Sequence, residues 1–317
     1  MSASVTAKRL ATREYAPLVA IVLTWGSVAA AGPADAVRLL AAVTFVRAAR
    51  SLTAPAALGP LRTRLGSPAA RRQATEAALG IEAAALAGAL AALGAILALL
   101  WAAGQDQLLL LCLLFAPALP VRSLLPLTAA RSLAGGYRLT LALLGLVLAA
   151  AGWAAGADID LFALLLVARE WLALPIAYAL APRVQPVETP GTPLEWREIA
   201  AHSHALGRRR VAYRFSRLFL QAFLGPFGGI AARTGRGMQL DGKFARFVPG
   251  HPAALAIVAV AAAGAAGALI LLYPEPVLLV LAASLMRTSA AAANVLLWRR
   301  LSRGAAIGNR IEDDDED

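Results

Sequence analysis

Residues 253–298 read AALAIVAVAAAGAAGALILLYPEPVLLVLAASLMRTSAAAANVLLW, two apolar runs separated by the short stretch YPEP. Each run has about the 20 residues that a helix needs to cross roughly 30 Å of hydrocarbon. The prolines and the glutamate between the runs are typical of a turn at the membrane surface. The stretch therefore predicts two transmembrane helices joined by a short loop.

The rest of the chain has the same character. Of its 317 residues, 59% are hydrophobic and only 15% are charged, which is too apolar for a soluble domain of this size. We therefore predict an all-α fold, a polytopic bundle of about eight to nine transmembrane helices. Residues 16–31 resemble the core of a signal peptide, but the topology needs them as a span, so we expect no cleavage. The predicted spans are residues 16–31, 37–57, 77–103, 108–129, 139–155, 161–180, 253–273 and 277–298.

Charge alternates between successive loops. In a soluble protein, a net charge of +11 would suggest binding to nucleic acid. Here the arginines lie in short loops, where they orient the helices against an anionic membrane leaflet. We expect no nucleic-acid partner. The loops between the basic ones carry Asp35, Asp106, Asp158 with Asp160, and Glu275. By the positive-inside rule, both termini face the cytoplasm of a bacterial-type inner membrane.

The predicted spans divide the chain into four parts. These are a six-helix transmembrane half (1–182), a polar cytoplasmic linker and helix (183–210), a partial second transmembrane repeat (211–303) and an acidic disordered tail (304–317). Residues 211–231 are apolar but flanked by arginines, so a single crossing would put one basic loop on the wrong side. An interfacial helix or a re-entrant hairpin fits the charges better, and the sequence leaves open whether this segment crosses.

An internal repeat relates the two transmembrane parts. VRAARSLTAPAALGP, residues 46–60, matches YRFSRLFLQAFLGP, residues 213–226, with one residue skipped. After each LGP come a basic loop, a long alanine-rich span, a short acidic loop and a second span with an arginine inside it. The arginines that correspond are Arg47 with Arg214, Arg50 with Arg217, and Arg122 with Arg287.

Residues 241–246, DGKFAR, match the D-G-x-x-A-R core of the CDP-alcohol phosphotransferase motif. That motif also needs an aspartate three positions earlier, where this chain has Met238, and two further aspartates downstream, whereas residues 247–264 contain no carboxylate. A lone Asp241 cannot hold the two metal ions of such chemistry. The repeat places these residues in an ordinary basic loop, so we expect no enzyme, metal or cofactor. A phospholipid-headgroup transferase centred on Asp241 and Arg246 is the alternative.

The layout resembles one half of a polysaccharide flippase of the multidrug/oligosaccharidyl-lipid/polysaccharide exporter superfamily. Two spans, a basic loop and two more spans are followed by the basic turn ARSLAGGYRLT and a further pair that ends at LAPR. The resemblance implies two six-helix halves around a central cavity, with cationic residues at positions such as Arg131. Here the second half stops after fewer spans. Either two chains combine, or the protein is a reduced relative with another role.

Ionisable residues inside the spans are the candidates for function, because an arginine at mid-depth costs about 2.5–3.5 kcal/mol on insertion scales. Arg122, Arg287 and the pair Arg169–Glu170 are such residues. Arginine suits two-pronged contact with phosphate, which a lipid-diphosphate-linked sugar would present. Snorkelling is the alternative for Arg122 and Arg287, and pairing with neighbouring helices is favoured for Arg169 and Glu170.

Prolines distinguish Arg122 from Arg287. Pro117, Pro120 and Pro126 should break the helix around Arg122 and free carbonyl groups, which is tolerated where a span lines a cavity.

The functional hypothesis is a transporter-like protein that binds or moves lipid-linked polysaccharide intermediates, with membrane lipids, a second copy or an envelope-assembly protein as partners. A non-catalytic membrane partner in envelope assembly is a further alternative. The candidate ligand-binding residues are Arg122, Arg287, Arg47, Arg50, Arg214 and Arg217.

Overall fold

The structure is a computed structural model that describes residues 3–53, 68–121, 134–179 and 251–314 apart from 274, together with residues 211, 214 and 218. Every regular element in these residues is an α-helix, which confirms the all-α prediction. The helices are α1 (Ala3–Ala31), α2 (Pro33–Thr53), α4 (Pro68–Ala102), α5 (Asp106–Phe115), α7 (Ala134–Ala154), α8 (Ile159–Ala179), α12 (Pro252–Leu272) and α13 (Pro276–Asp314).

Each predicted span falls on one of these helices, but two helices differ from prediction in length. α5 ends at Phe115, although its span was expected to reach residue 129. Pro117 interrupts the helical hydrogen bonds, because it has no N–H to donate to the carbonyl of Leu113, while Ala116 before it keeps α conformation. α13 continues to Asp314, through the residues from 304 onward that the sequence assigned to an acidic tail.

Three of the described helices are long and apolar enough to cross a membrane, judged by length and composition. They contain the stretches Leu79–Ala102 in α4, Pro252–Leu272 in α12 and Pro276–Leu301 in α13. Shorter apolar stretches lie in α1, α5 and α7. α2 and α8 carry ionisable residues in their interiors. This composition supports membrane association of the chain.

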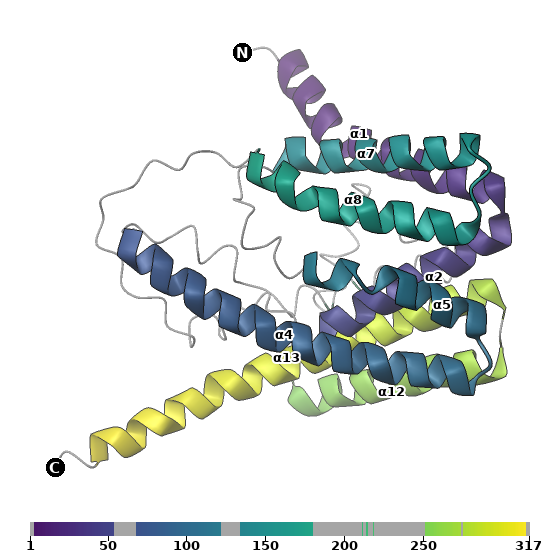
Figure 1. Cartoon of the computed structure of the whole chain (residues 1–317). Coiled ribbons are helices and arrows are strands. Elements are labelled where there is room, and N and C mark those ends of the chain that lie inside the picture. The colour runs from purple at the N-terminus through teal and green to yellow at the C-terminus, as the bar shows by residue number, and fades with distance from the viewer. Residues whose placement is uncertain are drawn as a thin grey trace.

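The helices form two groups with α2 and α5 between them (Figure 1). α1, α7 and α8 pack together on one side, and α4, α12 and α13 lie on the other. α2 packs along α13 and also contacts α4, α5 and α8. Every residue of α2 from 39 to 46 is buried, so α2 is the central helix of the bundle.

Small residues let α2 and α13 lie close together. Ala42 and Ala49 in α2, and Ala283 and Ala291 in α13, are buried in the core. Interfaces of small residues are typical of helix pairs in membranes, where close backbone approach replaces the hydrophobic effect. Asn294 adds a polar contact, because its side-chain amide donates to the carbonyl of Leu52 at 2.8 Å. That carbonyl is in the last turn of α2 and has no partner within its own helix.

The four short connections between helices lie at the same end of the bundle, on the right in Figure 1. Gly104 and Gly156 end α4 and α7 with φ of +67° and +68°, a left-handed conformation that favours glycine. The acidic residues of the short loops gather at this end, each near a helix N-terminus, where negative charge is favourable. Asp158, for example, accepts the backbone N–H of Leu161 at 2.8 Å.

This arrangement yields a prediction of topology. In a Cys112→Ala background, a cysteine at Asp106 should react with a membrane-impermeant maleimide from the periplasmic side, because acidic short loops are expected outside. A cysteine within residues 61–75, the basic stretch that leads into α4, should react only from the cytoplasmic side. Labelling of the Asp106→Cys protein from the cytoplasmic side alone would contradict the orientation.

Thr53 and Gly88 set the separation of α2 and α4. The Thr53 hydroxyl donates to the carbonyl of Ala85 at 2.6 Å, which fixes this short side chain. A Cβ added at Gly88 would come within 2.6 Å of the Thr53 methyl carbon. Gly94, on the same helix, has open space around it.

We predict that Gly88→Ala lowers the thermal stability of the protein in detergent. Forced overlap in a packed interface costs about 1–3 kcal/mol, more than the roughly 1 kcal/mol that alanine gains over glycine in a helix. Gly94→Ala is the matched control and should leave the midpoint of unfolding unchanged or raise it. Equal midpoints for the two variants would show that Thr53 does not hold α2 against α4.

Candidate functional site

The second half of α2 carries two of the predicted arginines into the bundle. Arg50 lies beside Glu82 of α4, with 3.4 Å between its Nη2 and the Glu82 Oε2. The side chains are 15% and 3% exposed. The sequence reasoning missed Glu82, although the signal was present, because a carboxylate inside an apolar span is as costly as an arginine and needs a partner.

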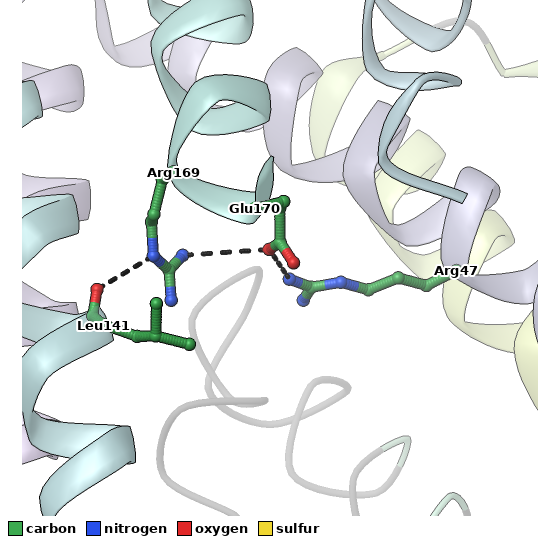
Figure 2. A network of polar contacts seen from close by, with 4 residues as sticks. All are labelled: Arg47, Leu141, Arg169 and Glu170. Atoms are coloured by element: carbon green, nitrogen blue, oxygen red, sulfur yellow. Dashed lines mark hydrogen bonds and ion pairs between the residues drawn. The ribbon is translucent and has the colours of Figure 1, made fainter. Parts of the chain in front are cut away.

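Glu170 of α8 lies between two arginines, as Figure 2 shows. Its Oε1 is 3.8 Å from Nη2 of Arg47 and 4.0 Å from Nη1 of Arg169. Arg47 belongs to the central helix, whereas Arg169 and Glu170 belong to the group of α1, α7 and α8. The shared carboxylate therefore connects the two sides of the bundle.

Arg169 is also held by α7, where its Nε donates to the carbonyl of Leu141 at 2.9 Å. Gly145 makes room for this contact, because a Cβ there would come 3.0 Å from Cδ of Arg169. The absence of a side chain lets the arginine cross the surface of α7 and reach the backbone. Arg169 and Glu170 thus pair with neighbouring helices, the interpretation that the sequence favoured for them.

The ion pairs around Glu170 are long. Tight bonds between a guanidinium and a carboxylate measure about 2.7–2.9 Å, so distances of 3.8 and 4.0 Å indicate attraction without short hydrogen bonds. At 1.5 Å per residue, Arg47 lies about 21 Å along α2 from Pro33, and Glu170 about 17 Å along α8 from Ile159. Both distances, measured from the end of the bundle where the short acidic loops lie, are smaller than the roughly 30 Å thickness of a hydrocarbon core.

Arg287 and Arg214 are partly buried. Arg287 lies on α13, the helix that packs along α2, close in sequence to the buried polar residues Ser284 and Thr288. The structure thus places Arg47, Arg50 and Arg287 on two adjacent helices. The remaining predicted positions lie outside the described residues, namely Arg122, Arg131, Arg217, Asp241 and Arg246.

The chemistry of the cluster is that of anion binding. Within the described ranges, no three histidine, cysteine, aspartate or glutamate side chains come close enough together to hold a metal ion. A guanidinium keeps its proton at physiological pH and presents several donors in one plane. Arg47 and Arg169 present these donors towards Glu170, the anion that the chain itself supplies.

Comparisons with protein-family models, with curated proteins and with solved structures find no match for this chain.

The Arg50–Glu82 pair gives a stability prediction. Glu82→Leu removes a buried carboxylate from beside Arg50, and breaking such a pair costs about 3–5 kcal/mol. The double variant Arg50→Met with Glu82→Leu should recover most of this loss, because no charge is then left in the interface. The measurement is a double-mutant cycle on unfolding in detergent. Additive losses would show that the two side chains do not interact energetically.

Proposed function

We propose that this chain is a multi-pass protein of a bacterial-type inner membrane that binds or translocates lipid-linked polysaccharide intermediates without covalent chemistry. In this proposal the eight predicted spans form a membrane-embedded bundle, with the acidic turns outside and both termini in the cytoplasm. The observation that carries the proposal is the carboxylate of Glu170, which Arg47 and Arg169 share.

A diphosphate is a stronger ligand for this pair of arginines than the carboxylate. It carries more negative charge and more acceptor oxygens, and each guanidinium can contact it with two parallel hydrogen bonds. The diphosphate takes the place of Glu170, whose Oε1 lies 3.8 Å from Arg47 and 4.0 Å from Arg169. An anion at this position would lie between α2 and α8, on the boundary of the two helix groups.

The lipid link in the proposed ligand follows from the surroundings of the cluster. α7 and α8, which carry the partners Leu141, Arg169 and Glu170, expose large apolar side chains such as Val147 and Trp171. An anionic group reaches arginines at this depth most readily when a hydrocarbon chain anchors it in the bilayer. The saccharide in the proposal rests on the resemblance in layout to polysaccharide flippases.

A partner completes the proposal. The second repeat has fewer spans than the first half, so a two-sided cavity needs either a second copy of the chain or an envelope-assembly protein. The C-terminal end of the long α13 extends away from the other helices, where a partner can reach it (Figure 1).

Binding of undecaprenyl diphosphate to the purified protein tests the proposal. We expect Arg47→Ala to weaken binding by about 10- to 100-fold, the equivalent of one charge-assisted hydrogen bond of about 1.5–3 kcal/mol. Glu170→Gln should tighten binding, because it removes the negative charge that competes for Arg47 and Arg169. Isothermal titration with the diphosphate, and with uncharged undecaprenol for comparison, measures both effects.

Arg38→Ala is the matched control for Arg47→Ala. Arg38 is on the same helix but at the acidic end, where it contacts Asp35 at 2.8 Å. Its removal should leave affinity unchanged. A purely structural role for the cluster predicts instead that Arg47→Ala and Glu170→Gln both lower stability and neither alters affinity in the expected direction.

A further inference from the structure

A pocket of about 410 Å³ lies between α2, α4, α12 and α13, on the side of the bundle away from α8. It falls within the range of about 300–1,000 Å³ typical of small-molecule pockets. The pocket exists because several helices present an alanine, with its small side chain, at the same height in the bundle. The lining residues are Ala48, Ala49, Leu52, Ala92, Ala95, Ile96, Leu99, Ala263, Met286, Ser289 and Ala290.

The pocket has a floor, two walls and an opening. α2 and α13 pack closely and form the floor, while α4 and α12 form the walls and make few contacts with each other. The lining residues of α4, α12 and α13 come from the middle of the three stretches that are apolar enough to cross a membrane. The opening between α4 and α12 therefore faces the hydrocarbon core of the bilayer.

We infer that this pocket binds one acyl chain of a membrane phospholipid, which enters sideways between α4 and α12. The inference depends on the membrane location of the chain and not on the ligand proposed for Arg47. It assigns a lipid-binding site to a part of the molecule that the arginine cluster does not use.

Water is a poor occupant of this pocket. A buried water needs about two to four polar partners, but among the described residues that line the pocket only Ser289 has a polar side chain. Its hydroxyl already donates to the carbonyl of Ala259 at 2.6 Å. A helix of a partner protein does not fit either. A single helical turn with its side chains is about 10–12 Å across and already occupies roughly 400–600 Å³. A single flexible hydrocarbon chain matches both the size and the apolar lining.

The pocket is distinct from the site around Glu170. Ala48, Ala49 and Leu52 lie about 100–200° around α2 from Arg47, given 3.6 residues per turn. Arg47 is directed towards α8, whereas the three pocket residues face α4, α12 and α13. A lipid held at Arg47 would have to cross the closely packed α2 to reach this pocket with its tail. The acyl chain in the pocket therefore belongs to a phospholipid of the bilayer.

Native mass spectrometry of the full-length protein, purified in mild detergent, tests the site. The wild type should retain a phospholipid adduct after extensive detergent exchange. Ala263→Phe, which fills the pocket from α12, and Ala92→Phe, which fills it from α4, should both lose it. Ala261→Phe adds the same bulk to α12 at an exposed position outside the lining and should retain the lipid.

A labelling experiment on the wild type removes any dependence on the folding of variants. Phosphatidylglycerol with a diazirine in the middle of its acyl chain should crosslink to Met286 or Ala290 on the floor, as well as to exposed residues such as Val260. Labelling confined to exposed residues would overturn the inference. So would equal lipid retention by Ala263→Phe and Ala261→Phe, or a change of oligomeric state in Ala263→Phe without loss of lipid.

Discussion

Charge enclosed within an apolar bundle is the constraint on which this structure depends. α2 is buried along its middle yet carries Arg47 and Arg50, and an arginine in such surroundings needs anionic or polar partners nearby. The neighbouring helices supply them as Glu82 on α4 and Glu170 on α8. The positions of α4 and α8 around the central helix are therefore fixed by electrostatics as well as by packing.

Two sides of α2 differ in what they require. Towards α4 and α13, hydroxyl and amide side chains satisfy backbone carbonyls between helices, as Asn294 does for Leu52. Towards α8, the ion pairs of Glu170 add to the apolar packing of residues such as Phe162 and Leu166. Charge and packing therefore act together where the group of α1, α7 and α8 meets the central helix.

The length of the apolar segments made the helices predictable from the sequence. The contacts between helices were not predictable in this way. The hairpin of residues 253–298 and the end of α5 before Pro117 follow from local chemistry in the sequence. The contact of Arg50 with Glu82 joins residues 32 apart, and it depends on how helices pack. Gly145, which opens the path of Arg169 to α7, looks like any other glycine until α8 lies against it.

A structure of the protein in lipid nanodiscs with undecaprenyl diphosphate, determined by electron cryo-microscopy, tests the central claim most directly. We predict density for the diphosphate in hydrogen-bond contact with Arg47 and Arg169, and the carboxylate of Glu170 turned away from both. A diphosphate bound elsewhere, with Glu170 still between the two arginines, would contradict the account.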